Sequence, residues 1–480
     1  MNYIMVLHII GWIVEFEGGF LLLPGFVGLL YGEYSASITY FLTAIICCLI
    51  GFLMRRKKPQ NFDLYAREGF AAVALSWIAM SVLGAIPFVA VGDIPNYVDA
   101  LFETISGFTT TGASILPEVE HLTHAGLFWR SFTHWIGGMG VFVFIMSILP
   151  LMGGSTINLM RAESPGPSVS KLVPRVRDTA KILYQIYIGV TLLEILLLCI
   201  CRMPLFDAFT ITFGTVGTGG FGVRNDSIAG YSPAIQIVIT VFMVMSGMNY
   251  VFYFALLRGK FKDAFSIEEV RWYLFIVLAS VAMITWNIRP LYGSFGETTR
   301  HAFFQVGSIL TTTGYSTVDF DMWPQLSKTV LLTIMFIGGC AGSTSGGIKV
   351  SRLVILAKAA KKEVATLMHP RLVKRIQMDG HNLSHETIRS TNVFISVYCL
   401  VMVASVLLIA LDEFDFTTNF TAVVATLNNI GPGLAGVGPA HNFGFFSNFS
   451  KIVLMFDMLA GRLELFPMLI VLSPSCWKRY

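Results

Sequence analysis

Apolar segments of about the length of a membrane-spanning helix recur ten times along this 480-residue chain. A helix needs about 20 predominantly apolar residues to cross the hydrocarbon core of a bilayer. Charged residues make up 13% of the chain, compared with about 25% in soluble domains. We therefore expect an all-α polytopic membrane protein. The predicted spans are residues 3–31, 36–54, 69–91, 127–152, 182–201, 234–257, 272–288, 329–348, 393–411 and 452–472.

Four shorter apolar segments lie between some of these spans, and a polar, glycine-containing stretch follows each of them. They are too short to cross a bilayer, so we interpret them as re-entrant pore helices. The order of long helix, short helix, polar loop and long helix occurs four times. The short segments are residues 99–108, 205–213, 302–310 and 420–430.

Basic residues gather on one side of this ten-span arrangement. Clusters of Lys and Arg at 55–58, 161–181, 258–271, 349–389 and 478–479 contain most of the 33 basic residues. The opposite loops hold mainly acidic residues. Because Lys and Arg are enriched in cytoplasmic loops, we expect both termini in the cytoplasm and the four short segments to enter from outside.

Two of the polar stretches share a short string. SGFTTTGASI surrounds Gly112, and SILTTTGYST surrounds Gly314. An alanine stands at the same spacing before each glycine, Ala100 in the first case and Ala302 in the second. Internal repeats of this kind indicate structurally related units.

The second and fourth stretches depart from this string. Ala208 selects Gly220 as the equivalent glycine in the second stretch, whereas Gly431 and Gly433 are both candidates in the fourth, whose register stays open. We expect four pseudo-symmetric repeats around a central ion pore. The predicted domains are residues 1–60 with two N-terminal helices, then pore repeats at 61–160, 161–262, 263–365 and 366–480, the third with an intramembrane gating loop.

The chemistry of these loops points to a cation. Non-helical backbone at membrane depth survives only where it is buried in protein or lines a water-filled path. Glycine lets successive carbonyls point the same way, and threonine hydroxyls add acceptors. A ring of such oxygens can replace the hydration shell of a monovalent cation. One TTTG string is compatible with an ordinary polar turn, but four loops favour a selectivity filter. Its predicted residues are Thr110, Thr111, Gly112, Thr218, Gly219, Gly220, Thr312, Thr313, Gly314, Asn429, Ile430, Gly431 and Gly433.

The string GGCAGSTSGG interrupts the predicted span 329–348. Glycine costs about 1 kcal/mol per helix-interior position relative to alanine, so we expect a break in the helix there. A close-packed interface of small residues is the alternative. We interpret the string as a flexible loop across the pore. Its predicted gate residues are Gly338, Gly339, Gly342, Ser343, Thr344, Ser345, Gly346 and Gly347, together with Arg462.

Charged residues near the spans receive separate interpretations. Arg462 lies inside the last span, where a central arginine costs about 2.5–3.5 kcal/mol on insertion scales, so we expect it to face a cavity and loop carbonyls. Lys349 is expected to mark the cytoplasmic boundary. Glu464 is a local partner for Arg462 only if the two share a helix face, which i, i+2 residues do not. Glu15 and Glu17 are expected to serve packing or to lie near an interface, in either case outside the pore.

Enzymatic motifs are missing from the sequence. It contains no P-loop, dinucleotide-binding glycine fingerprint, hydrolase elbow or HExxH string. The seven cysteines fall mostly in apolar runs, and Cys199-x-Cys201 reads more simply as apolar packing than as a metal pair. We expect neither an enzyme, nor a covalent cofactor, nor a nucleic-acid partner.

At these residues the chain resembles the potassium-transporter superfamily that includes Trk, Ktr and plant HKT transporters, and within it the bacterial TrkH branch. The resemblance extends over essentially the whole chain and includes the pair of N-terminal spans. Besides TTTGAS and TTTGYS, it rests on HWIGGMGVFVFIMSILP, GGCAGSTSGGIKVSR, LNNIGPGL and GRLELFP.

The resemblance implies potassium uptake through a gated, channel-like pore in the bacterial inner membrane, with K⁺ as the transported ion at the filter residues. It also implies a homodimer and cytosolic, nucleotide-binding TrkA-type regulatory subunits. It matches residues 338–347 to an intramembrane gating loop and Arg462 to a pore-facing arginine. The basic stretch 349–389 fits docking of a regulatory ring and attraction to lipid headgroups equally well.

Other transport mechanisms remain open at the level of sequence. The main alternative is an H⁺- or Na⁺-coupled potassium symporter of the same fold, which would need an intramembrane carboxylate in the path. We find none convincingly placed. A sodium- or ammonium-conducting pore and a non-transporting sensor are further alternatives. Because the second and fourth loops lack TTTG, we expect weaker potassium-over-sodium selectivity than four identical loops would give.

Overall fold

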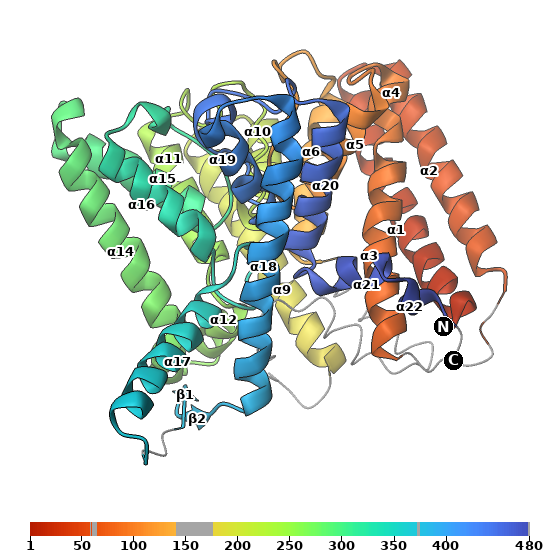
Figure 1. Ribbon diagram of the computed structural model, residues 1–480. Coiled ribbons are helices and arrows are strands. Elements are labelled where there is room, and N and C mark those ends of the chain that lie inside the picture. Colours follow the sequence, from red (N-terminus) through yellow and green to blue (C-terminus); the bar gives the residue numbers. More distant parts are fainter. Residues whose placement is uncertain (58, 60–64, 141–175, 372–374, 479–480) are drawn as a thin grey trace.

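The computed structural model describes residues 1–57, 59, 65–140, 176–371 and 375–478. Within these residues the chain forms helices that stand side by side, together with one small hairpin of two strands (Figure 1). The prediction of an all-α polytopic protein is confirmed.

The first two helices form an antiparallel hairpin at one edge of the molecule (Figure 1). They are α1 (Tyr3–Leu30) and α2 (Tyr34–Arg55). Gly11 lets the backbone of α2 approach closely, since a Cβ there would lie 2.8 Å from a carbonyl oxygen of α2. Glu15 accepts hydrogen bonds from the Arg55 guanidinium, with an N–O distance of 2.5 Å in the ion pair. Glu15 therefore joins α1 to α2.

Four sets of elements follow, each with a long helix, a short helix, a loop and a second helix. The long helices are α3 (Ala66–Gly84), α9 (Val176–Ile200), α14 (Glu268–Ile288) and α18 (His385–Ile409). The short helices are α5 (Tyr97–Phe108), α10 (Leu205–Gly217), α15 (Phe295–Leu310) and α19 (Phe416–Leu427). The second helices begin as α6 (His124–Gly138), α11 (Pro233–Ser246), α16 (Gln325–Ile337) and α20 (Asn448–Arg462). Short connecting helices are α4 (Ile86–Val91) and α13 (Phe261–Ser266).

The short helices have well-defined starts. Asn96 caps α5, Ser294 caps α15 and Asp415 caps α19, each by accepting a backbone N–H with its side chain. Such acceptors satisfy donors that the first helical turn leaves unpaired. Each short helix then ends directly at one of the four glycine-containing loops.

The second helices are broken, as the sequence predicts for span 329–348 but not for the other spans. After α11 the chain turns by 98° into α12 (Tyr250–Leu257). α16 ends at Gly338, whose φ is 74°. The break in span 329–348 falls at the glycine-rich string, where the sequence predicts it. The break in span 234–257 is not predicted, because hydropathy stays high through backbone positions that do not continue a helix.

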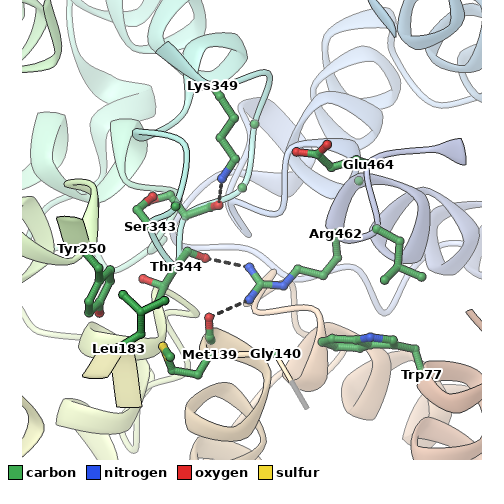
Figure 2. Close-up of a pocket in the computed structure, with 17 residues that line it drawn as sticks. Trp77, Met139, Gly140, Leu183, Tyr250, Ser343, Thr344, Lys349, Arg462 and Glu464 are labelled. Carbon is green, nitrogen blue, oxygen red and sulfur yellow. Dashed lines mark hydrogen bonds between the residues drawn. The ribbon is translucent and has the colours of Figure 1, made fainter. Parts of the chain in front are cut away.

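The last span shows the same interruption. α20 ends at Arg462, whose side chain points into a pocket (Figure 2). Positive φ values at Glu464 and Leu465 then redirect the chain into α21 (Phe466–Leu472), so the predicted span 452–472 is not one helix. In the first repeat α6 ends at Gly138, and the remainder of span 127–152 lies mostly outside the described residues.

The number of uninterrupted spans is accordingly smaller than ten. Six helices in the described part are long and apolar enough to cross a membrane alone, and a seventh span results if α11 and α12 count as one. Outer helices expose large apolar side chains, such as Leu49 on α2, Leu278 on α14 and Leu400 on α18. Such faces suit a hydrocarbon environment.

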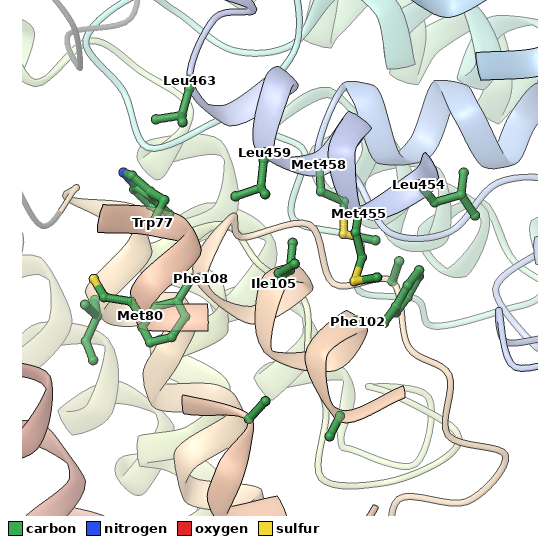
Figure 3. Packing of buried hydrophobic residues seen from close by; sticks show 14 of the residues in the cluster. Trp77, Met80, Phe102, Ile105, Phe108, Leu454, Met455, Met458, Leu459 and Leu463 are labelled. Atoms are coloured by element: carbon green, nitrogen blue, oxygen red, sulfur yellow. The ribbon is translucent and has the colours of Figure 1, made fainter. Parts of the chain in front are cut away.

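A dense core surrounds the first short helix. Figure 3 shows Phe102, Ile105 and Phe108 of α5 packed between Trp77 of α3 and the apolar side chains of α20, including Met458. All five of these side chains are buried. This packing fixes where α5 ends and its loop begins.

Both termini lie toward the same end of the molecule as the β hairpin (Figure 1). That end also carries α17 (Val350–Met368), which extends beyond the bundle, and α22 (Pro474–Trp477). The hairpin pairs β1 (Gln377–Met378) with β2 (His381–Asn382). Lys358 of α17 donates a hydrogen bond to the Gln377 carbonyl and ties the helix to the hairpin.

Candidate functional site

The loops after the four short helices share one unusual backbone pattern. In each loop a non-glycine residue with positive φ stands two positions before a glycine with positive φ. Non-glycine residues rarely adopt this conformation. The first residues, with φ of 55–57°, are Thr110, Thr218, Thr312 and Asn429, and the glycines, with φ of 78–97°, are Gly112, Gly220, Gly314 and Gly431.

This pattern decides the register of the fourth loop, which the sequence left open. Gly431 has a φ of 97° and Asn429 a φ of 56°, as the pattern requires, whereas Gly433 is not among the residues with positive φ. Gly433 instead donates its backbone N–H to the Val437 carbonyl. Gly431 is therefore the structural equivalent of Gly112.

The four glycines join the loops in a closed cycle. Each lies against the carbonyl oxygen of the residue just before the glycine of the next loop, where a Cβ would approach to 2.9 Å or less. The contacts pair Gly112 with Gly219, Gly220 with Thr313, Gly314 with Ile430 and Gly431 with Thr111. We call these four loops the glycine ring. It brings twelve of the thirteen predicted filter residues together in one register and leaves Gly433 just outside.

The glycine ring lies at the C-terminal ends of the short helices. The helix macrodipole places partial negative charge at such ends, which favours a cation. A cavity of about 160 Å³ lies on one side of the ring, and all four ring glycines contribute to its lining. Arg130, Asn225 and His441 also line this cavity.

The threonine hydroxyls of the first and third loops bond within the loops. Thr109 Oγ1 and Thr111 Oγ1 are 2.8 Å apart, and Thr311 Oγ1 and Thr313 Oγ1 are also 2.8 Å apart. Asn429 Nδ2 donates to Thr111 Oγ1 at 2.9 Å and so joins the fourth loop to the first. These hydroxyls brace the glycine ring, a role that the sequence analysis did not assign to them.

The glycine-rich string predicted as a gate is a non-helical segment between α16 and α17. We call residues 338–349 the intramembrane loop. The Gly346 N–H donates to Thr312 Oγ1 at 2.7 Å, which places the loop directly against the glycine ring. The Cys340 N–H bonds the Gly247 carbonyl at 2.8 Å, at the break between α11 and α12. The loop is thus held at the level where the second helices are broken.

A buried carboxylate on α14 anchors the intramembrane loop. Glu269 Oε1, near the start of α14, accepts the N–H of Ala341 at 2.6 Å and the N–H of Ser351 at 3.0 Å. One oxygen therefore binds both the loop and the first turn of α17. This role could not be predicted from sequence, because Glu269 lies in an ordinary helix start, 72 residues before Ala341.

Arg462 connects three repeats. Its guanidinium donates to the Thr344 carbonyl of the intramembrane loop at 2.7 Å and to the Gly138 carbonyl of α6 at 3.0 Å. It also bonds the Gly137 carbonyl. Figure 2 shows the side chain between these two elements. The predicted gate residues and Arg462 thus meet at one place.

A second cavity, of about 100 Å³, lies beside Arg462. It is lined by Gly342–Gly347 of the intramembrane loop and by Trp77, Tyr250 and Glu464, among others (Figure 2). The intramembrane loop separates this cavity from the glycine ring, which it contacts through Gly346. The intramembrane loop therefore contacts the glycine ring and lines the second cavity.

Lys349 departs from its predicted role, and Glu464 has a partner that the sequence does not predict. Lys349 does not mark an exposed boundary: it is 2% exposed, has a φ of 83° and donates to the Ser345 carbonyl. The chain folds back after Gly347, which sequence position alone does not reveal. Glu464 pairs with Arg352 at 2.6 Å rather than with Arg462, because the helix ends between them.

Three further buried carboxylates, on α1, α9 and α20, line neither of the two cavities. Glu17 is buried on α1 near Gly84 of α3, as expected for a packing role. Glu194 on α9 and Asp457 on α20 are also buried, and neither lines the two cavities. No group of three His, Cys, Asp or Glu residues suited to a metal ion occurs in the part of the chain that the structure describes.

Comparisons with known proteins agree with this geometry. The family model described as TrkH, cation transport protein, matches residues 35–479. The Trk system potassium uptake protein TrkH of Salmonella typhimurium is 38% identical, and that of Escherichia coli K12 is 37% identical, each over the full length of both chains. The crystal structure of the potassium transporter TrkH from Vibrio parahaemolyticus covers all of both chains with a TM-score of 0.88 and 33% identity. This chain therefore belongs to the TrkH family of cation transport proteins, which are ion transporters and not enzymes.

Proposed function

We propose that the chain takes up potassium ions through a gated, channel-like pore whose selectivity filter is the glycine ring. The observation that carries this proposal is the closed cycle of glycine–carbonyl contacts among the four loops. A ring of backbone oxygens can take the place of the water around a cation. The relatives named as potassium uptake proteins supply the identity of the ion, which is the cargo of the protein.

The intramembrane loop and Arg462 act as the gate in this proposal. The loop contacts Thr312 on the ring side and lines the second cavity on the other, so an ion leaving the ring meets loop backbone. Arg462 adds a positive charge beside the path, which opposes the passage of a cation. Conduction therefore requires the loop and Arg462 to move apart.

Coupled symport is the alternative mechanism. It needs a titratable or sodium-binding group that the ion path reaches. Among the described residues, Glu464 is the one carboxylate that lines either cavity, and it is paired with Arg352 at 2.6 Å. Glu194 and Asp457 are buried, but neither lines the described cavities. Passive, gated permeation therefore fits the geometry better.

The location and assembly also belong to the proposal. We place the protein in the bacterial inner membrane, with the end that carries both termini, α17 and the hairpin in the cytoplasm. The basic residues of α17 suit a docking site for TrkA-type regulatory subunits, and a homodimer with one pore per chain is the expected membrane unit. The domain limits at residues 60, 160, 262 and 365 delimit four pore repeats after the N-terminal pair.

Ion flux into liposomes that contain the purified protein tests the mechanism. Potassium flux should follow the potassium electrochemical gradient and should not be driven by a pH or sodium gradient alone. Uphill potassium movement driven by either of those gradients would replace the channel with a symporter.

A further inference from the structure

The second loop of the glycine ring lacks the pair of hydrogen-bonded threonines that the first and third loops contain. By the backbone pattern, Gly217 and Gly219 occupy the positions of Thr109 and Thr111 in the first loop. The same two positions in the third loop hold Thr311 and Thr313. Those threonine pairs are hydrogen-bonded within their loops at 2.8 Å. The second loop has no side chain at either position, so its conformation must be held in another way.

The ring of His134 occupies the space that a side chain at Gly219 would fill. A Cβ added to Gly219 would collide with the Cγ, Nδ1 and Cδ2 atoms of that ring. The φ of Gly219 is not in the left-handed region, so its backbone would accept a side chain if the ring were absent. His134 is 0% exposed and comes from α6 of the first repeat.

Both nitrogens of His134 are hydrogen-bonded to backbone near the ring. Nδ1 lies 2.8 Å from the Gly107 carbonyl oxygen of α5, and Nε2 lies 3.2 Å from the backbone nitrogen of Phe221. A carbonyl only accepts and a backbone N–H only donates. Nδ1 therefore carries the proton and Nε2 the lone pair. In this single neutral tautomer, His134 ties the end of α5 to the segment that follows Gly220.

Phe221 is held from several directions. Its ring centroid lies 4.3 Å from that of His134, and the guanidinium carbon of Arg130 lies 3.6 Å from the Phe221 centroid. The Tyr315 hydroxyl, from the third loop, donates to the Phe221 carbonyl at 3.2 Å. His134 supplies the only one of these contacts that bonds the Phe221 N–H within the described structure.

We propose that His134 is the positioning residue of the second loop, where its imidazole takes the place of the threonine pair found in the first and third loops. By fixing Phe221 and excluding a side chain at position 219, it sets the carbonyl direction of Gly219, which contacts Gly112. His134 thereby contributes to ion selectivity without touching the ion. This inference rests on the proposed filter function of the glycine ring.

Bi-ionic reversal potentials of the purified full-length protein in planar bilayers provide the test. His134→Ala should lower the potassium-over-sodium permeability ratio about tenfold, because a buried N–H loses its acceptor. His134→Asn keeps a donor for the Gly107 carbonyl. Its permeability ratio should therefore lie between those of the wild type and His134→Ala. Trp135→Phe on the same helix is the matched control. It should leave the permeability ratio unchanged, because the Trp135 indole N–H bonds Thr191 and not a residue of the glycine ring.

A double variant separates positioning from general stability. Gly219→Thr alone should also lower the ratio, because the side chain collides with the imidazole. His134→Ala combined with Gly219→Thr should recover a higher ratio than either single variant, or recover folded protein if a single variant does not fold. Independent, additive losses in the double variant would overturn the assignment.

The comparison with Gly314→Ala distinguishes the positioning role of His134 from the filter function of the glycine ring. If Gly314→Ala lowers the permeability ratio and His134→Ala leaves it at the wild-type value, the positioning role fails and the filter stands. If neither variant changes the ratio, the proposed filter function itself fails.

Discussion

The backbone N–H of Gly346 donates a hydrogen bond of 2.7 Å to the side-chain oxygen of Thr312. Thr312 belongs to the glycine ring and Gly346 to the intramembrane loop. The element that we propose to select ions is therefore bonded directly to the element that we propose to block them. In the gating movement that we propose, this hydroxyl would lose its donor and become available to the pore.

Thr312→Val should increase potassium flux. Valine keeps the shape of threonine but cannot accept the Gly346 N–H, and leaving a buried donor unpaired costs about 1–3 kcal/mol. This cost falls on the closed loop, so we expect about tenfold more flux in liposomes. Thr299→Val is a suitable control, because its exposed hydroxyl bonds only its own helix. Equal flux for wild type and Thr312→Val would show that this bond does not hold the gate.

Arg462→Ala should also raise flux, because it removes both a positive charge and the bonds to Thr344 and Gly138. Arg462→Lys should have a smaller effect, since an ammonium keeps the charge but lacks the planar fork that reaches both carbonyls. Single-channel recording measures open probability for the two variants. A control at the other end of α20 is Lys451→Met, which breaks a pair with Asp99. An open probability of Arg462→Ala no higher than that of the wild type would contradict a gating role for Arg462.

Gly314→Ala should reduce selectivity without unfolding the protein. Gly314 has a φ of 87°, and a Cβ there would collide with the Ile430 carbonyl oxygen, so the fourth loop must shift. Gly296→Ala lies in the same repeat with nothing within 4 Å of the new atom and serves as the control. Permeability ratios for potassium, rubidium and sodium give the readout. Retention of all three ratios in Gly314→Ala would argue against a filter at this ring.

Glu269→Leu should destabilise the closed position of the intramembrane loop. It removes the acceptor for the N–H groups of both Ala341 and Ser351, whereas Glu269→Gln keeps a carbonyl oxygen at that position. We expect Glu269→Leu to lower the melting temperature and raise flux, and Glu269→Gln to remain close to the wild type. Thermal unfolding and liposome flux on the same preparations measure both effects. Identical behaviour of the two variants would mean that the shared acceptor is unimportant.

The placement of the pore loops could be read from the sequence because it depends on local requirements. A short apolar helix followed by glycine leaves few structural options at membrane depth. The spacing from Ala100 to Gly112 and from Ala302 to Gly314 identified Gly220 as the equivalent glycine of the second loop. The fourth loop has Asn429 and Ile430 in place of threonines, so only the backbone angles could decide for Gly431.

Other features depend on contacts between distant parts of the chain. Hydropathy continues across Gly247 and Leu465, so the breaks after α11 and α20 left no signal, unlike the break at the glycine-rich string after α16. Lys349 follows an apolar span in the sequence, yet the intramembrane loop turns it back into the protein. The bond between His134 and Phe221 of the next repeat, and the bonds of Glu269 to backbone 72 and 82 residues further along the chain, likewise appear only in the folded structure.

Reversal potential under bi-ionic conditions tests the central claim most directly. With potassium on one side of a planar bilayer and sodium on the other, the purified wild-type protein should give a potential of the sign set by potassium permeation. The same measurement on Gly314→Ala should give a potential shifted toward zero, while Gly296→Ala should match the wild type. A wild-type reversal potential at zero, or of the sign set by sodium, would contradict a potassium filter formed by the glycine ring.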